Sequence, residues 1–181
     1  GELIAEIVSS AEGIEGCHIL SSEPDADYNR TDVTLAGNPD AVSEAAFRLI
    51  SSAKQHIDMR EHEGEHPRLG AVDVCPFIPL RGISMADCSE IAISLGYRVA
   101  TELNLPVYHY GESASDDSRL LLSNLRKGEY EGLEGRLSDA ESPSHSASTR
   151  WPDQGPRIWD NTIAKFGAVV IGARPILVAY N

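Results

Sequence analysis

Basic residues are scarce in this sequence of 181 residues, which has 15 lysines and arginines against 28 aspartates and glutamates and a net charge of −13. The lysines and arginines are scattered and form no cluster. Because binding to DNA or RNA depends on clustered cations that neutralise phosphates, we expect no nucleic-acid partner. An anionic small molecule fits this charge balance only where a few cations converge in a cleft.

Long apolar runs are also lacking. No stretch approaches the ~20 residues that a membrane-spanning helix needs, and the first residues lack the pattern of a signal peptide. We therefore expect no membrane partner. The chain opens with glycine instead of methionine, so we expect a segment upstream of it. Its length suits one compact domain and is short for two.

Cysteines are few and show no pairing pattern. Cys17, Cys75 and Cys88 are odd in number, have apolar neighbours and lack C-x-x-C spacing. This usage is typical of buried free thiols in a reducing compartment, so we predict a cytoplasmic protein. No environment that would lower a thiol pKa surrounds Cys75 or Cys88, and we expect neither to be reactive.

Apolar residues recur with helical spacing in some segments and with strand spacing in others. Asn38 and Pro39 predict a helix start, and Ser84 with Asp87 forms a capping box before another helix. The strand at 71–78 is closed by prolines and is therefore predicted as a short strand or an edge strand. In chain order, the expected elements are a helix at 3–11, strands at 17–22 and 31–36, a helix at 39–57, the strand at 71–78, a helix at 85–103, a strand at 106–110, a helix at 116–127, and strands at 168–171 and 176–180.

This order of elements predicts an α+β fold. We expect a ferredoxin-like sandwich built on a split βαβ unit, with helices packed on one face of a mainly antiparallel sheet and with its first strand missing. Residues 136–157 are predicted as a polar loop or a disordered segment, because their central part has too few apolar side chains to pack. Residues 1–181 are expected to form one domain.

The string His62-Glu63-Gly64-Glu65-His66 matches the HExxH pattern of zinc hydrolases, in which two histidines one helical turn apart bind the metal. That pattern requires a helix. Gly64 weakens a helix at its centre, and Pro67 drives the residue before it into extended backbone geometry. We therefore predict that no metal binds here.

His66 itself is a candidate general base. Pro67 restricts its backbone, and Glu65 and Arg68 can tune its charge. A histidine that titrates near neutrality can deprotonate an amine nucleophile and accelerate a reaction by ~10²- to 10⁴-fold. A lone loop histidine can equally be structural, and spacing alone leaves both roles open.

Several strings resemble one enzyme family. They are DMREHEGEHPRLGAVDVCPFIPLRGISMADC at 58–88, NRT at 29–31, LPVYHYGE at 105–112, RKGEYEGL at 126–133 and GARPILVAYN at 172–181. Together they are similar to the N-terminal subdomain of glutamate formiminotransferases, which move a formimino or formyl group between N5 of tetrahydrofolate and the amino group of glutamate. The resemblance implies that His66 is the proton acceptor, that 5-formimino- or 5-formyl-tetrahydrofolate and glutamate are the substrates, and that no metal takes part.

The resemblance also implies a folate-binding loop shortly before the final strands. Trp159 and Lys165 are unusual features of this chain in that region. Trp159 can stack on a pterin ring or pack locally, and Lys165 can pair with a folate carboxylate or stay solvated. The expected folate contacts are Gly155, Pro156, Lys165, Phe166 and Gly167.

Charged residues elsewhere complete the expected site. Glu23 and Asp25 correspond to acidic positions near the active site of the family, although both also suit turn chemistry. Arg30 and Arg68 can each bind a substrate carboxylate through two parallel hydrogen bonds or can form a structural salt bridge. We expect Glu23, Arg30 and Arg68 to contact substrate.

The family resemblance also implies a partner. In the full enzymes, a second, similarly folded subdomain follows, and the active site lies between the two. We therefore expect a C-terminal subdomain as a partner, in the same chain or in another one, and a homodimer is compatible with this arrangement. The alternative is a non-catalytic folate-binding or interaction module that consists of half an enzyme.

Overall fold

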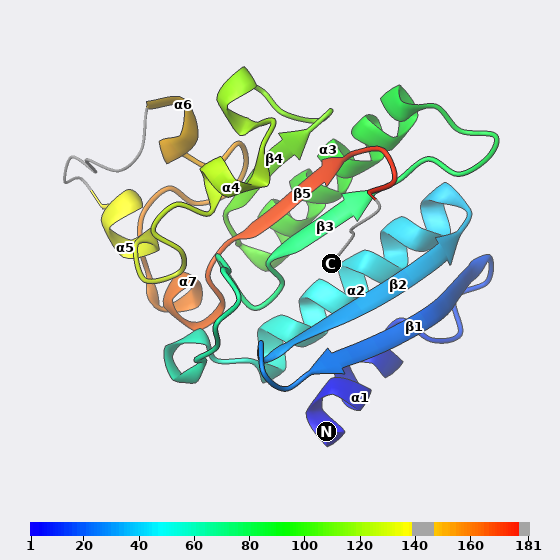
Figure 1. The fold of residues 1–181 in the computed structure, drawn as a ribbon, viewed down its shortest axis with the longest axis horizontal. Helices are drawn as coiled ribbons and strands as arrows, with labels where there is room; N and C mark the ends of the chain where they lie inside the picture. Colours follow the sequence, from blue (N-terminus) through cyan, green and yellow to red (C-terminus); the bar gives the residue numbers. More distant parts are fainter. Residues whose placement is uncertain (139–146, 178–181) are drawn as a thin grey trace.

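Two separate β-sheets and two long helices form the framework of the protein (Figure 1). The structure is a computed structural model that describes residues 1–138 and 147–177. It confirms the predicted α+β class, because α-helices and β-strands both occur along the chain and pack together in the main core. Within the described residues, no helix is long and apolar enough to cross a membrane.

The smaller sheet is an antiparallel hairpin of β1 (Cys17–Asp25) and β2 (Arg30–Gly37). Its turn follows Asp25, whose carboxylate accepts hydrogen bonds from the backbone N–H groups of Asp27 at 3.0 Å and Tyr28 at 3.1 Å. This is turn chemistry of the kind that aspartate supports. The prediction that these two strands are neighbours is confirmed.

The larger sheet is parallel, with the strand order β3-β5-β4. The prediction of a mainly antiparallel sheet is therefore wrong for the larger of the two described sheets. The reason is the crossover through α3 (Met85–Leu103), because a helix-length connection between β3 (Val74–Phe77) and β4 (Val107–Gly111) carries the chain back to the same end of the sheet. β5 (Val169–Ala173) enters between them in the same direction. Within the described sheet, β3 has four residues and lies at an edge, which agrees with the prediction of a short or edge strand.

The helices begin where the sequence predicts. α2 (Pro39–His56) has a proline in its first turn, and α1 (Glu2–Ser9) packs against it. α3 begins with the predicted capping box. The Asp87 N–H donates to Ser84 Oγ at 3.1 Å, and the Ser84 N–H donates to Asp87 Oδ2 at 2.9 Å.

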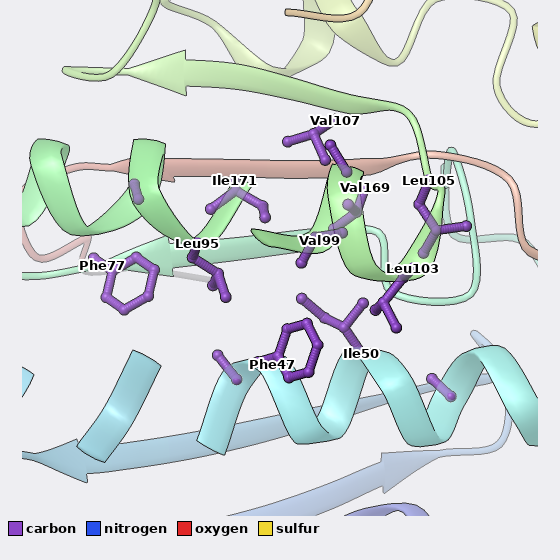
Figure 2. Close-up of a cluster of buried hydrophobic side chains, with 14 of the residues drawn as sticks. Phe47, Ile50, Phe77, Leu95, Val99, Leu103, Leu105, Val107, Val169 and Ile171 are labelled. Carbon is purple, nitrogen blue, oxygen red and sulfur yellow. The ribbon is translucent and has the colours of Figure 1, made fainter. Parts of the chain in front are cut away.

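The main hydrophobic core lies between α2, α3 and one face of the parallel sheet (Figure 2). In Figure 2, Phe47 and Ile50 of α2 point toward Leu95 and Val99 of α3, and Ile171 of β5 lies beyond them. All five side chains are at most 8% exposed. The predicted apolar faces of both helices are thus the faces that are buried.

Short helical turns cover the opposite face of the parallel sheet and lie together at one side of Figure 1. The single helix predicted at 116–127 is instead broken at Leu121, whose backbone is extended. Arg119, two residues before the break, bonds with Asp153, a partner 34 positions away that the helical pattern of the sequence could not show. The short elements are η1 (Met59–Glu61), η2 (Asp117–Arg119), α4 (Leu122–Leu125), α5 (Leu133–Arg136), α6 (Ala147–Arg150) and α7 (Asn161–Phe166).

Two expected segments are only partly described. Of the polar loop predicted at 136–157, residues 139–146 lie outside the described residues, while α5 ends before them and α6 begins after them. The part from α6 onward is held in place by the buried carboxylate of Asp153, so it differs from a loose loop. Of the last predicted strand, 176–180, the described residues 176 and 177 are not in a strand.

Candidate functional site

The segment from His62 to Arg68 links η1 to the strands of the parallel sheet and is not helical. It lies on the turn of the β1–β2 hairpin. The side-chain amide of Asn29 donates to the carbonyl of Glu63 at 2.7 Å. A Cβ atom on Gly64 would lie 2.7 Å from the carbonyl oxygen of Tyr28, so only glycine allows this close approach. We call residues 62–68 the base loop.

His66 is half-buried where the base loop meets the turn of the hairpin. Its ring meets the ring of Tyr28 edge-on, with centroids 6.2 Å apart and an interplanar angle of 89°. Tyr28 is itself 45% exposed, so the pair lies at the surface. Within the described part of the chain, the ring nitrogens of His66 make no hydrogen bond. Both nitrogens are therefore available to a substrate.

The electrostatic surroundings of His66 favour its neutral form. Burial is the largest cause that lowers its pKa below the ordinary value of 6.5, followed by the positive charges of Arg30 and Arg126. The carboxylates of Asp73 and Asp32 act in the opposite direction with smaller effect. A histidine with a lowered pKa is largely neutral at pH 7 and can accept a proton.

Arg30→Gln is expected to raise the pKa of His66 toward 6.5, because it removes a nearby positive charge that disfavours the imidazolium. Part of the shift should remain, since burial is the larger cause. An NMR titration of the His66 ring protons measures the change. Arg48→Gln on α2 is the matched control and should leave the titration as it is in the unsubstituted protein. An Arg30→Gln titration identical to that control would contradict the prediction.

The lowered pKa of His66 also affects stability. The folded state binds this proton less readily than the unfolded state, whose histidine titrates near 6.5. This group therefore lowers the free energy of unfolding as the pH falls from 6.5 to the folded-state pKa, and it adds no further loss below that value. At neutral pH and above, the penalty is absent.

An ion pair between Asp73 and Arg126 lies near His66. The Arg126 guanidinium contacts Asp73 Oδ2, and the other carboxylate oxygen of Asp73 accepts the N–H of Leu69 at 2.9 Å. Both charged side chains are mostly buried. Neither residue has a local signal in the sequence, because they lie 53 positions apart and neither has a motif spacing relative to His66. Their only signal was that both occur within the strings that carry the family resemblance.

Arg68 is the most extensively bonded side chain of the base loop and is 8% exposed. Its guanidinium has five N–H groups, and all of them are used. A substrate carboxylate could bind Arg68 only by displacing a glutamate, so its predicted contact with substrate stays a prediction, and this bonding weighs against it. Nε donates to His62 Nδ1 at 3.3 Å, Nη2 to His62 O at 3.1 Å and Glu131 Oε1 at 2.7 Å, and Nη1 to Glu129 Oε2 at 3.2 Å and Glu131 Oε2 at 2.9 Å.

A pocket of about 390 Å³ lies beside the base loop. Its only cation is Arg68, whose N–H groups already serve the glutamates. The pocket therefore carries net negative charge and is a poor site for a folate carboxylate. Its lining residues are Glu63, Gly64, Arg68, Gly128, Glu129 and Glu131.

The predicted folate loop is split between two places. Gly167 lies next to the base loop, since it forms an antiparallel bridge with Gly70. Gly155 instead lies beside the start of β4, on the far side of β5. Both have positive φ, at +84° and +88°, and an added Cβ would meet a carbonyl oxygen at 2.2 Å, so both positions require glycine for structural reasons. Phe166 is fully buried in the core, and its carbonyl already accepts the N–H of Ala71 at 2.8 Å, so its folate contact stays a prediction that this burial weighs against.

Lys165 and Trp159 both have structural contacts. The Lys165 ammonium donates to the carbonyl of Gln55 at 3.0 Å, near the C-terminal end of α2, where a cation is favoured. Trp159 packs against Tyr130, with ring centroids 6.2 Å apart. It also packs against the buried apolar residues on the face of the parallel sheet that α4, α5 and α7 cover. This supports local packing over stacking on a pterin. The folate contact of Lys165 stays a prediction.

The acidic residues of the hairpin have different positions. Asp25 bonds with the turn, as described above. Glu23 is exposed on β1 opposite Asp32. Asp32 also pairs with Arg30 at 3.4 Å, and the Arg30 guanidinium lies 5.6 Å from the centre of the Tyr28 ring. Glu23 and Arg30 therefore belong to the same sheet as the turn that contacts His66.

The HExxH match does not form a metal site in this arrangement. His62 and His66 lie on a non-helical segment, and both ring nitrogens of His62 already have hydrogen-bond partners. Among the residues that the structure describes, no three histidine, cysteine, aspartate or glutamate side chains are arranged to hold a metal ion.

Known proteins match this chain over almost its entire length. A family model described as formiminotransferase domain, N-terminal subdomain, matches residues 1–174. The formimidoyltransferase-cyclodeaminase of Rattus norvegicus is 45% identical over 181 residues, which cover 99% of this chain and 31% of that protein. The glutamate formimidoyltransferases of Streptococcus pyogenes serotype M1 and Thermoplasma acidophilum are each 38% identical, over 99% and 98% of this chain and 56% and 54% of their own lengths. The chain thus spans about a third to just over half of these curated relatives.

Proposed function

Because the chain belongs to the family of formiminotransferase N-terminal subdomains, we propose that it supplies the general base for folate-dependent one-carbon transfer. The group moved is formimino or formyl, and it passes between N5 of tetrahydrofolate and the amino group of glutamate. The relatives are named as formimidoyltransferases, and the proposal extends that activity to this chain. The observation that carries it is the half-buried imidazole of His66, whose lowered pKa keeps it neutral and whose nitrogens are available.

The chemistry of the transfer needs such a group. The amino group attacks the formimino carbon as the neutral amine, and its nitrogen, which becomes positively charged as the new bond forms, must then lose one proton. The neutral His66 accepts this proton, and the resulting imidazolium can donate it to N5 of the folate as the carbon–nitrogen bond breaks. One residue near neutrality thus serves both steps, and the proton count balances.

Cations around His66 support anionic substrates. Arg30 and Arg126 are the positive groups that act on its pKa. Each is paired with an aspartate, Arg126 with Asp73 and Arg30 with Asp32. Arg30 is the more exposed of the two arginines, so we propose it as the cation that meets a folate or glutamate carboxylate. We propose that the substrates lie on the hairpin side of the base loop, with Arg30 and Glu23 as contacts and with Gly167 nearby. Gly155, which lies beside the start of β4, and Pro156 and Lys165 remain part of the proposal as folate contacts.

We also propose that the two sheets are parts of one ferredoxin-like sheet that lacks a strand. β2 and β3 are connected by α2 and run in the same direction (Figure 1). No described strand pairs with β3 on its free edge or joins it to β2. One strand antiparallel to both would join the sheets and complete the split βαβ layout. A C-terminal subdomain would then supply the second wall of the active site.

We propose a reducing, cytoplasmic setting for the protein. Cys17, Cys75 and Cys88 are all free thiols, as this compartment favours. Burial raises the pKa of the Cys75 thiol to about 12, which supports an unreactive structural role. A homodimer is compatible with the proposal but has no separate support.

The alternative function is folate binding or protein interaction without turnover. This chain matches 31% of the length of the rat relative, and the alternative assigns binding to that share and turnover to the whole. Transfer from 5-formimino-tetrahydrofolate to glutamate should be assayed with residues 1–181 alone and joined to the C-terminal segment that follows in the relatives. We expect transfer in the joined polypeptide. Folinate binding without transfer would favour the alternative, and absence of both would reject both functions.

A further inference from the structure

A chain of hydrogen bonds through His62 joins the base loop to the hairpin turn. His62 Nε2 lies 3.0 Å from the carbonyl oxygen of Asn29, and Arg68 Nε donates to His62 Nδ1 at 3.3 Å. A guanidinium can only donate and a carbonyl can only accept. These partners therefore assign the ring proton to Nε2, and this one tautomer satisfies both bonds.

Further bonds hold the main chain around His62. Arg68 Nη2 donates to the carbonyl of His62 at 3.1 Å, and the Asn29 side chain donates to the carbonyl of Glu63. Asn29 thus contacts the base loop with both its backbone and its side chain. The base loop is thus fixed to the hairpin turn through His62 and Glu63, on the N-terminal side of His66. On the C-terminal side of His66, it is held by Arg68.

Arg68, which donates to His62, is itself held in one position. The guanidinium of Arg68 is fixed by Glu131 through a pair of hydrogen bonds and by Glu129 through a third. Its 8% exposure leaves little room for another rotamer. On the other side, Asn29 has a φ of +48°, so its carbonyl belongs to a defined tight turn. The His62 ring bridges two well-placed groups.

We propose that His62 is a positioning residue that, as its Nε2–H tautomer, holds the His66 imidazole against the hairpin turn and so sets its placement toward the substrate. This inference rests on the proposed role of His66 as the base. His62 cannot itself ligate a metal or transfer a proton without breaking one of its two bonds. Its contribution acts through the contact between His66 and Tyr28.

Three variants of His62 test its bond to Arg68 and its bond to Asn29 separately. His62→Asn can keep the acceptor for Arg68, and His62→Gln can keep a donor for the Asn29 carbonyl, whereas His62→Ala loses both. A misplacement of about 1 Å can cost roughly 10²-fold in rate. We expect His62→Ala to lower kcat by about that factor with little change in KM, and each amide variant to recover part of the loss. His18→Gln, an exposed histidine on β1, is the matched control.

NMR of residues 1–181 supplies a readout that does not depend on turnover. The ring of Tyr28 shifts the His66 ring protons through its ring current, and His62→Ala should reduce that shift. A folded His62→Ala protein with unchanged His66 shifts and unchanged kcat would overturn the inference. If no transfer occurs even without substitution, the proposed function fails while the NMR result still decides the role of His62. If His62→Ala does not fold, the same comparison is made with His62→Gln and His62→Asn.

Discussion

Replacing His66 with alanine should lower kcat for formimino transfer by about 10²- to 10⁴-fold, the range that a positioned general base contributes. KM should change little, because proton transfer stabilises the transition state and not the bound substrate. The His66 ring is half-buried and makes no hydrogen bond with the described residues, so the free energy of unfolding should change only slightly. Steady-state kinetics of the polypeptide joined to its C-terminal segment measure the effect.

Two further proteins make the His66 experiment decisive. His66→Gln keeps a polar side chain of similar reach but cannot accept the proton, so it should be about as slow as His66→Ala. His18→Ala removes an exposed histidine from the same hairpin and should retain full activity. In the unsubstituted protein, kcat/KM should fall at low pH as His66 becomes protonated, with a pKa below 6.5. This fall should be absent from both His66 variants. A His66→Ala enzyme within about tenfold of the unsubstituted one would contradict the assignment.

Replacing Asp153 with alanine should lower the free energy of unfolding by about 3–5 kcal/mol, the cost of leaving a buried charge without its partner. Asp153 Oδ2 accepts from Arg119 Nη1 at 2.6 Å and from the backbone N–H of His109 at 2.7 Å. Its other oxygen accepts the Ser115 hydroxyl at 2.5 Å. The side chains of Arg119 and Asp153 are 6% and 13% exposed, so water cannot replace the lost carboxylate.

The Asp153 experiment is an equilibrium urea unfolding, read by circular dichroism. Asp117→Ala is the control, because Asp117 is an exposed aspartate of η2 in the same region and should change stability by only a few tenths of a kcal/mol. A loss below about 1 kcal/mol in Asp153→Ala would show that solvent reaches Arg119. The variant should also loosen the segment that places Gly155 beside β4, because Asp153 is bonded there to the strand.

Local signals in the sequence were sufficient for most elements. Apolar periodicity, Pro39 and the Ser84–Asp87 capping box predicted α2 and α3, because such signals act within one or two helical turns. Pro76 and Pro79 predicted that β3 is a short strand or an edge strand, and β3 lies at an edge of the described sheet. The predicted helix at 116–127 is wrong at Leu121, where the backbone is extended, and the nearby bond from Arg119 to Asp153 spans 34 positions, beyond the reach of a local pattern.

The candidate site was predicted in part. Gly64 and Pro67 argued correctly against a helix, and thus against the zinc pattern, because their backbone preferences are local. The family resemblance is confirmed by the comparisons and gave His66 its proposed role. The partners of His66 could not be predicted, because Tyr28 and Arg126 are brought to it from different elements by the fold.

The sequence alone therefore determined the α+β class, the long helices, the family and the identity of the candidate base, since each depends on local patterns or on direct similarity. Only the tertiary structure decided that the larger sheet is parallel, that Arg68 is saturated by glutamates, and that His62 is held in one tautomer. Each of these depends on contacts between residues far apart in the chain. His66 could be picked out from the sequence as the candidate base, but the docking of the base loop on the hairpin turn, which lowers the pKa of His66 through burial and Arg30, is a property of the fold.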